Sequence, residues 1–244
     1  MTSQVFSLPF VKKESAAKET WSYFFDRTNV SYDFQPGQYN RVTLPITAMD
    51  TRGNSRMFTI ASSPTDKDVL MITTKRGISD FKNAFFTLEA GMQVQFFGPL
   101  GGFVLPEEDP TPRILLARGI GITPFHSMLR YAGEKNISIS LTLIASFSTV
   151  EEMIYYEELT NLAKLHPNLK IVYTVTRPEE SKNSWEGEKG RISPEMIKKY
   201  VADTISPFYM ISGPPAFVDG TVDALQTSLS IAEEKIKVDQ FTGY

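Results

Sequence analysis

A glycine-containing turn is the first stretch whose residue types suit ligand chemistry. The segment Gly119–Pro124 follows Ile114–Ala117, a short apolar run typical of a strand buried on both faces. Its two glycines allow the backbone to bend tightly and a ligand to approach closely. Thr123 can cap a helix, and Pro124 suits the first helical position, where no N–H is needed. This layout directs backbone N–H groups and a positive helix end at one point, which favours a phosphate-bearing ligand.

The same turn departs from the common dinucleotide-binding pattern. That pattern, G-x-G-x-x-G, has a third glycine where this chain has Pro124. A lysine that could bind phosphate is also missing after the turn. Taken alone, the segment leaves two interpretations open, a ligand-binding loop and an ordinary tight turn.

A second candidate for ligand chemistry lies in the segment Arg56–Pro64. In an extended strand, alternation places Arg56 and Phe58 on one face and Met57 and Thr59 on the other. An arginine beside an aromatic ring could clamp a pyrophosphate and support a flat ring system. The alternative is an ordinary strand with an arginine at the surface.

Composition excludes several other kinds of chemistry. The chain has 244 residues, 41% of them hydrophobic and 22% charged, which is typical of a packed globular protein. Its net charge of −3 gives no basic footprint for nucleic acid. The absence of cysteine excludes disulfides, thiolate nucleophiles and cysteine-held iron–sulfur or zinc sites. Its two histidines, His126 and His166, form no recognisable ligand pair, so we expect no metal site.

The sequence also gives no sign of a membrane segment. The stretch Met1–Lys13 has no long apolar core, and no later segment is long enough to span a bilayer. We therefore expect a cytoplasmic protein.

The first hundred residues are rich in short β segments. Turn formers such as Pro36-Gly37 separate them. One short helix is expected after the cap Ser79, because Phe81 and Phe85 recur at helical spacing. Six short strands with one helix predict an antiparallel barrel or sandwich. The expected strands are Val5–Val11, Trp21–Phe25, Gln38–Leu44, Met57–Ser62, Val69–Thr74 and Met92–Phe97.

The polar, proline-rich run Pro106–Pro112 marks a change in character and is typical of a domain linker. We expect one domain over residues 1–106 and a second over residues 107–244. In the second, strands and helices alternate, which predicts an α/β fold with an open parallel sheet of five strands. These strands are Ile114–Ala117, Ile139–Ala145, Leu169–Val175, Pro207–Ile211 and Ile236–Val238.

The expected sheet places two glycine-containing turns at one edge. Ligands of parallel sheets bind beyond the carboxyl ends of the strands, and both Gly119–Pro124 and Gly213–Pro215 directly follow a strand. Between them, a helix is expected from Thr149 to about Leu165, because Thr149 and Glu152 match a capping box.

Several short motifs occur in order along the chain. They are Arg56–Thr59, Gly77–Ser79, Gly98–Gly101, Gly119–Pro124, Gly213–Pro215 and Phe241–Tyr244. This series resembles the ferredoxin–NADP reductase family in its bacterial form, a single flavoprotein without an iron–sulfur domain. The resemblance extends from about Phe34 to Tyr244. It implies an FAD-binding, six-stranded antiparallel β-barrel followed by an α/β domain for a nicotinamide nucleotide.

For the barrel, the resemblance implies a set of flavin-binding roles. Arg56 would bind the flavin phosphate, Phe58 would pack on the flavin ring, and the Thr59 hydroxyl would face the ring nitrogen that accepts hydride. The segment Gly77–Ser79 would hold the flavin pyrophosphate at a helix start. The cofactor-binding candidates here are Arg56, Met57, Phe58, Thr59, Ile72, Gly77, Ile78 and Ser79.

For the second domain, the resemblance places Gly119–Pro124 under the nucleotide pyrophosphate and the nicotinamide. A terminal aromatic side chain, Tyr244 or Phe241, would stack on the flavin and move aside for the nicotinamide, since an aromatic pair contributes only about 0.5–1.5 kcal/mol. Cofactor-binding candidates are Gly119, Ile120, Gly121, Thr123, Pro124, Gly213, Pro214, Pro215, Phe241 and Tyr244. The catalytic candidates of the whole chain are Thr59, Thr123, Ser212 and Tyr244.

Two positions depart from the family pattern. Arg118 stands where the family usually has a glycine, and its side chain could contact a phosphate, contact a partner protein or crowd the nucleotide. Ser212 stands where a cysteine usually lines the nicotinamide site. Serine keeps the size and polarity of that position, so hydride transfer should survive.

The expected coenzyme is NADP in preference to NAD. Enzymes that use NAD tend to place an acid on the ribose hydroxyls after the second strand of the domain. Here that position is Ser146–Thr149, and the next acid is Glu151. Arg177 and Arg191 suit a ribose phosphate as further cofactor-binding candidates.

The sequence thus supports an FAD-dependent oxidoreductase that takes hydride from NAD(P)H and passes single electrons to a separate acceptor protein. The acceptor is separate because an iron–sulfur centre needs cysteines. A ferredoxin, a flavodoxin, a haem protein or an oxygenase component would fit. Two alternatives stay open: a free-flavin or ferric reductase of the same fold, and a non-catalytic relative that binds nucleotide or a partner, which Arg118 and Ser212 would permit.

Overall fold

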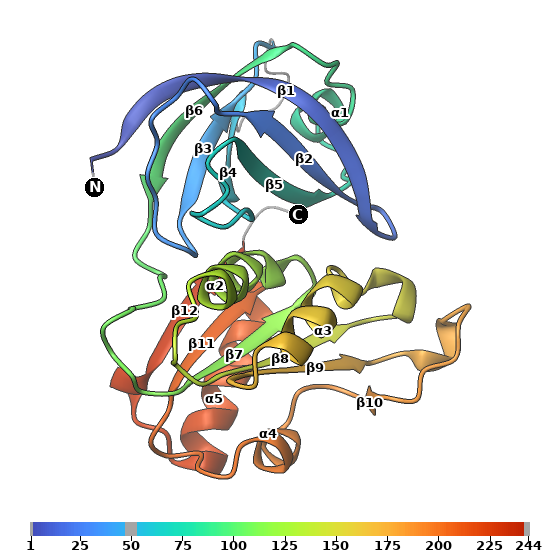
Figure 1. The fold of residues 1–244 in the computed structure, drawn as a ribbon. Helices are drawn as coiled ribbons and strands as arrows, with labels where there is room; N and C mark the ends of the chain where they lie inside the picture. The colour runs from blue at the N-terminus through green and yellow to red at the C-terminus, as the bar shows by residue number, and fades with distance from the viewer. Residues whose placement is uncertain (1, 47–52, 242–244) are drawn as a thin grey trace.

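The N-terminal half of the protein is an antiparallel barrel. The structure is a computed structural model that describes residues 2–46 and 53–241. The sheet runs in the order β4-β3-β6-β1-β2-β5, which confirms the expected six strands (Figure 1). The strands are β1 (Gln4–Ala17), β2 (Thr20–Asp26), β3 (Tyr39–Thr43), β4 (Ser55–Thr59), β5 (Val69–Lys75) and β6 (Gln93–Leu100).

The barrel closes around aromatic side chains. Strand β1 is long enough to pair with β6 along its first part and with β2 along the rest, with a register shift between Phe10 and Lys12. The two outer strands of this order, β4 and β5, also come together. Just after the end of β4, the Ala61 N–H donates to the Met71 carbonyl of β5 at 2.8 Å. The short helix α1 (Asp80–Phe86) plugs the barrel, and the Ser79 hydroxyl caps it as expected. The fully buried core includes Tyr23, Phe25, Phe81, Phe85 and Phe96.

The C-terminal half is a parallel sheet of six strands, one more than expected. Its order is β10-β9-β8-β7-β11-β12. The strand missed from the sequence is β10, which has only two residues and therefore shows no periodicity. The strands are β7 (Arg113–Arg118), β8 (Leu141–Phe147), β9 (Leu169–Val175), β10 (Glu188–Lys189), β11 (Phe208–Gly213) and β12 (Ile236–Gln240).

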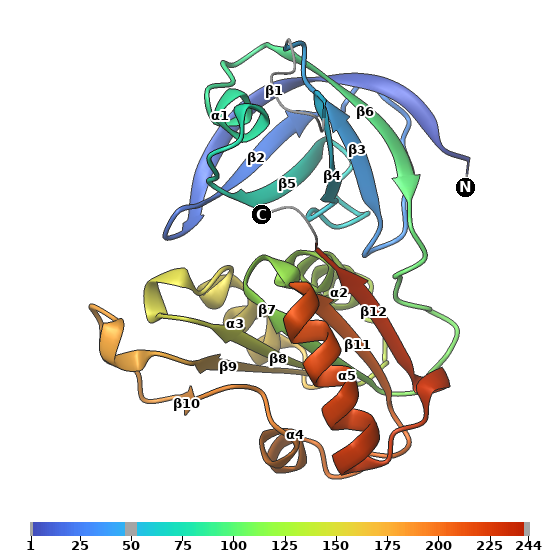
Figure 2. The ribbon, with the colours of Figure 1, turned by 180° about the vertical axis from the view of Figure 1, so that it is seen from behind.

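Helices cover both faces of this sheet, so its central strands are apolar on both sides. One face packs against α2 (Thr123–Glu134) and α3 (Tyr156–Leu165), and the other against α4 (Pro194–Tyr200) and α5 (Pro215–Leu229), as Figure 2 shows from behind. Among the described residues, no helix combines the length and the apolar composition needed to cross a membrane.

Two helix starts differ from the sequence expectation. Residues Val150–Glu152 form a 3-10 turn, and α3 begins only at Tyr156. The predicted capping box is wrong because Thr149 makes no capping hydrogen bond and the Glu152 carboxylate pairs instead with Lys75 at 3.1 Å. In α2, Thr123 is the first helical residue rather than the cap, and its hydroxyl donates to the Ile120 carbonyl at 3.0 Å.

Hydrogen bonds join the barrel to the parallel sheet along their contact. The ring of His126 is fully buried, with Nδ1 2.7 Å from the Ala61 carbonyl oxygen. The Ser127 hydroxyl donates to the Ser62 carbonyl at 2.7 Å. Elsewhere along this contact, the N–H of Lys18, between β1 and β2, donates to the Glu151 carbonyl at 2.8 Å. The division into domains at residues 1–106 and 107–244 stays a prediction.

Candidate functional site

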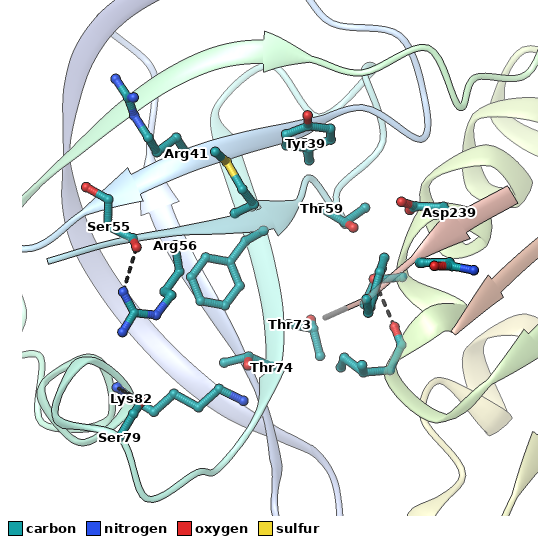
Figure 3. A pocket seen from close by; sticks show the side chains of 16 residues that line it. Tyr39, Arg41, Ser55, Arg56, Thr59, Thr73, Thr74, Ser79, Lys82 and Asp239 are labelled. Carbon is teal, nitrogen blue, oxygen red and sulfur yellow. Dashed lines mark hydrogen bonds between the residues drawn. The ribbon is translucent and has the colours of Figure 1, made fainter. Parts of the chain in front are cut away.

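The candidate site is a cavity of about 450 Å³ between the barrel and the parallel sheet (Figure 3). Strands β3, β4 and β5 and the start of α1 form its barrel side, and the turn after β7 and the end of β12 form the other side. Its lining residues are Tyr39, Arg41, Ser55, Arg56, Met57, Phe58, Thr59, Thr73, Thr74, Ser79, Lys82, Ile120, Thr123, Asp239, Gln240 and Phe241.

Eight residues singled out in the sequence meet at this cavity. Thr59 at the end of β4 and Thr123 at the start of α2 face the same space from the two halves of the molecule. Phe241 follows β12 and completes the wall. The eight are Arg56, Met57, Phe58, Thr59, Ser79, Ile120, Thr123 and Phe241.

Other predicted site residues do not line the cavity. Ile72 is fully buried in the barrel core, whereas Ile78 is 100% exposed. Tyr244 lies outside the described residues, so its predicted role stays a prediction. The described candidates away from the cavity are Ile72, Gly77, Ile78, Gly119, Gly121, Pro124, Arg177, Arg191, Ser212, Gly213, Pro214 and Pro215.

An aromatic stack forms one wall of the site. The Phe58 ring lies nearly parallel to Phe85, at 10° and 5.3 Å between centroids, and continues the stack toward Phe81. The Arg56 guanidinium lies 5.1 Å from the Phe81 ring centroid and donates to the carbonyls of Gly53 and Ser55. The wall is therefore a flat apolar surface, and hydrogen bonds fix the Arg56 guanidinium at its edge.

The cavity is electrostatically mixed. Its described lining includes the cations Arg41, Arg56 and Lys82 and one acid, Asp239. Burial raises the pKa of the Asp239 carboxyl to about 6. Near neutral pH this carboxyl therefore exchanges protons more readily than an ordinary aspartate does.

Sequence reasoning missed Asp239, although a signal for it existed. In an extended strand, residues two apart share a face, and Asp239 lies two residues before Phe241. Arg41 had no such signal in the sequence, because only the observed pairing of β3 with β4 sets it opposite Met57. The lining residues absent from our expected set are Tyr39, Arg41, Ser55, Thr73, Thr74, Lys82, Asp239 and Gln240.

A buried hydroxyl pair links the cavity to the contact between the halves. The Tyr155 hydroxyl donates to Thr73 Oγ1 at 2.5 Å. Burial raises the pKa of Tyr155 well above its ordinary value, so this hydroxyl stays protonated. The Tyr155 ring stacks on His126, with 3.8 Å between centroids. The position of Thr73 in the cavity wall is thus supported by residues of the parallel-sheet half.

In the turn after β7, Gly121 is packed against a neighbouring strand, whereas Gly119 borders open space. Gly121 lies so close to β11 that a Cβ there would be 2.2 Å from the Ser212 carbonyl oxygen. At Gly119, where φ is +56°, a Cβ would meet nothing within 4 Å. At the same sheet edge, the Ser212 hydroxyl is buried and lacks a hydrogen-bond partner among the described residues. Unpaired buried hydroxyls are costly, which marks this edge as a place where a polar ligand would be stabilised.

Comparison with known proteins shows what this chain is similar to. Residues 115–223 match the family model of the oxidoreductase NAD-binding domain. The chain is 24% identical over 240 residues to ferredoxin–NADP reductase B of Sorangium cellulosum, covering 96% of this chain and 92% of that protein. It is 26% identical over 219 residues to the glycine betaine monooxygenase reductase subunit of Chromohalobacter salexigens, covering 86% of this chain and 58% of that protein.

The chain is therefore similar to ferredoxin–NADP reductases and to reductase subunits of monooxygenases. This confirms the resemblance inferred from the motif order. The same fold appears in the crystal structure of the Amycolatopsis cytochrome P450 reductase GcoB, with a TM-score of 0.83, 22% identity and coverage of 99% of this chain and 72% of that chain. The chain spans under three fifths of the length of the betaine monooxygenase reductase subunit.

Proposed function

We propose that this protein is an FAD-dependent oxidoreductase that takes hydride from NADPH or NADH and passes single electrons to a separate redox protein. The observation that carries the proposal is the cavity between the two halves. There, Arg56, Phe58 and Thr59 of the barrel meet Thr123 and Phe241 of the parallel-sheet half. The similarity to ferredoxin–NADP reductase B over 96% of this chain supports it.

The barrel side of the cavity fits a flavin dinucleotide. Such a ligand has a flat ring system and a doubly charged pyrophosphate. The Phe58 ring, fixed by its stack on Phe85, suits the flat ring system. Arg56 and Lys82, which lie together on the lining, suit the phosphates. Thr59 supplies a hydroxyl for the polar edge of the ring, and Ser79 supplies another near the phosphates.

The parallel-sheet side fits a nicotinamide nucleotide. The open backbone at Gly119 and the unpaired hydroxyl of Ser212 lie at the carboxyl edge, where parallel sheets bind ligands. Arg177 and Arg191 are exposed and suit the ribose phosphate of NADP. Arg177 pairs with Glu180 at 3.0 Å, an exposed ion pair that a phosphate group can replace at little cost.

The residues of the chain position the reactants and control protons, while FAD supplies the redox chemistry by accepting hydride and releasing electrons one at a time. Thr59 and Thr123 would orient a flavin ring and a nicotinamide ring from opposite sides of the cavity. Phe241 would shield the cavity from water and would have to move for a nicotinamide to enter. Asp239, with its pKa near 6, holds or releases a proton at the cavity wall.

The electrons leave to a redox centre outside this chain. With no cysteine among its 244 residues, the chain lacks the usual ligands of an iron–sulfur cluster. A ferredoxin, a flavodoxin, a haem protein or an oxygenase component would accept single electrons. The name of the Chromohalobacter relative, a monooxygenase reductase subunit, favours an oxygenase component. A cytoplasmic location is part of the same proposal.

A visible absorption spectrum of the purified protein tests the proposal. We expect a flavin band, present as purified or after adding FAD, that bleaches when NADPH or NADH is added without oxygen. The faster coenzyme identifies the preference, for which we expect NADPH. A protein that takes up no flavin, or a flavin band that neither coenzyme bleaches, would contradict the proposed activity. Rapid turnover of free flavin without any bound flavin would identify a free-flavin reductase instead.

A further inference from the structure

The order of the strands defines a crevice at the carboxyl edge of the parallel sheet. The chain leaves β7 through α2 toward β8 on one side, whereas β11 lies on the other side of β7. A ligand crevice forms where strand connections diverge in this way. Arg118 is the last residue of β7, and Gly213 is the last residue of β11. Strands β7 and β11 are neighbours in the sheet, which lies beneath the barrel in Figure 1.

Arg118 and Gly119 are the accessible part of the turn after β7. Ile120 is only 6% exposed, and Ile122 and Thr123 are buried almost completely. By contrast, Arg118 is exposed, and the space beside Gly119 is open. A Cβ on Gly213 would lie 3.3 Å from the Arg118 Cβ, which places the stem of this side chain at the wall of the crevice. A ligand in the crevice therefore meets Arg118 before the rest of the turn.

The charge of Arg118 is not neutralised within the part of the chain that the structure describes. It forms none of the ion pairs found there, and its side chain makes no hydrogen bond there. Ser212, which pairs across the strands with the preceding residue Ala117, carries a buried hydroxyl that has no hydrogen-bond partner among the described residues. The helix start close by offers few free donors, because Pro124 has no N–H and the Thr123 hydroxyl is bonded to Ile120. An exposed guanidinium thus dominates the positive potential of this crevice.

We infer that Arg118 binds the pyrophosphate of the nicotinamide nucleotide. A guanidinium donates two parallel hydrogen bonds to phosphate oxygens, which matches a diphosphate better than a single hydroxyl or carbonyl. Arg118 supplies the charge that the helix start lacks, and Gly119 leaves room for the diphosphate beside the backbone. This inference rests on the proposed function, since it concerns the nucleotide of the same site.

The test compares the binding of NADP⁺ and NAD⁺ to the oxidised, FAD-loaded protein by titration calorimetry. We expect Arg118→Ala to weaken both nucleotides by the same factor, about tenfold or more, because both carry the pyrophosphate and a charge-assisted hydrogen bond is lost. Arg118→Lys should restore part of the affinity. The matched control is Lys198→Ala in α4, which removes one exposed positive charge far from the crevice and should leave both affinities unchanged.

The outcomes separate this inference from the proposed function. Unchanged affinity in Arg118→Ala, with normal binding by the unsubstituted protein, overturns the role of Arg118 only. Weaker binding of NADP⁺ alone would place Arg118 at the ribose phosphate and also overturn it. Tighter binding by Arg118→Gly would show that the side chain crowds the nucleotide. If the unsubstituted protein binds neither nucleotide, the proposed function itself fails.

Discussion

At the scale of single residues, the cavity contains groups that suit a ligand better than they suit folding. Asp239 is the clearest example, since burial opposes its charged form. The carboxyl contributes nothing to packing that an uncharged amide would not also contribute. Its presence beside Thr59, Thr123 and Phe241 is therefore more simply explained by proton transfer or ligand orientation than by stability.

The raised pKa of Asp239 predicts a specific pH dependence of stability. Its pKa is about 6 in the folded protein, against an ordinary value of 3.8. A carboxyl whose pKa is raised by folding favours the folded state below its ordinary pKa, and this advantage is lost as pH rises through about 6. Asp239→Asn should therefore increase the free energy of unfolding at pH 7.5 by about 1–3 kcal/mol and change it little at pH 4.

Urea unfolding of both proteins at the two pH values measures this difference. The comparison is made without added FAD, so that loss of ligand binding does not mask the effect on the protein. An equal difference at both pH values would show that the Asp239 carboxyl is not shifted.

At the scale of elements, the turn after β7 illustrates how one sequence motif serves two purposes. The sequence left open whether Gly119–Pro124 is a ligand loop or a tight turn. The structure shows that Gly121 packs against the β11 backbone, whereas Gly119 faces open space. The packing glycine fixes the position of the turn, and the open glycine leaves room beside it.

We expect opposite effects on stability from replacing Gly121, which is packed against β11, and Gly220, which has open space around it. Gly121→Ala should lower the free energy of unfolding by about 1–3 kcal/mol or more, because its Cβ would lie 2.2 Å from the Ser212 carbonyl oxygen. The matched control is Gly220→Ala in α5, where a Cβ meets nothing within 4 Å. That change should raise stability by about 0.4–1 kcal/mol, since alanine favours a helix over glycine.

Thermal unfolding of the two variants beside the unsubstituted protein measures both changes. A Gly121→Ala protein as stable as Gly220→Ala would mean that β11 does not approach the turn as closely as the structure has it.

At the scale of the whole molecule, the cavity exists only because the two halves are held together. Asp66 of the barrel accepts two hydrogen bonds from Arg130 of α2, at 2.7 and 2.9 Å. Both side chains are largely buried, and Arg130 also binds Glu134 at 2.7 Å. A paired, charge-assisted contact of this kind is stronger than an exposed ion pair. It joins the halves beside the hydrogen bond of His126 to Ala61.

We expect the loss of the Asp66–Arg130 contact to lower the free energy of unfolding more than the loss of an exposed ion pair does. Asp66→Asn should lower the free energy of unfolding by about 1–3 kcal/mol, since it leaves the Arg130 guanidinium partly unpaired. Asp33→Asn is the matched control, because Asp33 pairs with Lys67 at 3.3 Å with both side chains more than 60% exposed. Its effect should stay within about 0.5 kcal/mol. Urea unfolding at pH 7 compares the two, and equal losses would contradict a special role for the contact between the halves.

Much of the architecture could be predicted because it rests on local patterns. The strand Leu169–Val175 and the helix capped by Ser193 occur where the sequence places them, since apolar runs and caps act over a few residues. The sixth strand was not predicted because it has only two residues, Glu188–Lys189, which are too few to show an alternating pattern. The Thr149 capping box failed because Lys75, from the other half, takes the Glu152 carboxylate.

The sequence by itself determined the order of elements, the resemblance to flavoprotein reductases and five of the eleven barrel residues that line the cavity, including Arg56, Phe58 and Thr59. These follow from motifs of a few residues whose spacing is preserved along the chain. Only the tertiary structure decided that Asp239 lines the same cavity as Thr59. The physical reason is that the cavity forms between two independently patterned halves. Which side chains meet across it depends on the packing of one half against the other, a long-range arrangement that no local pattern encodes.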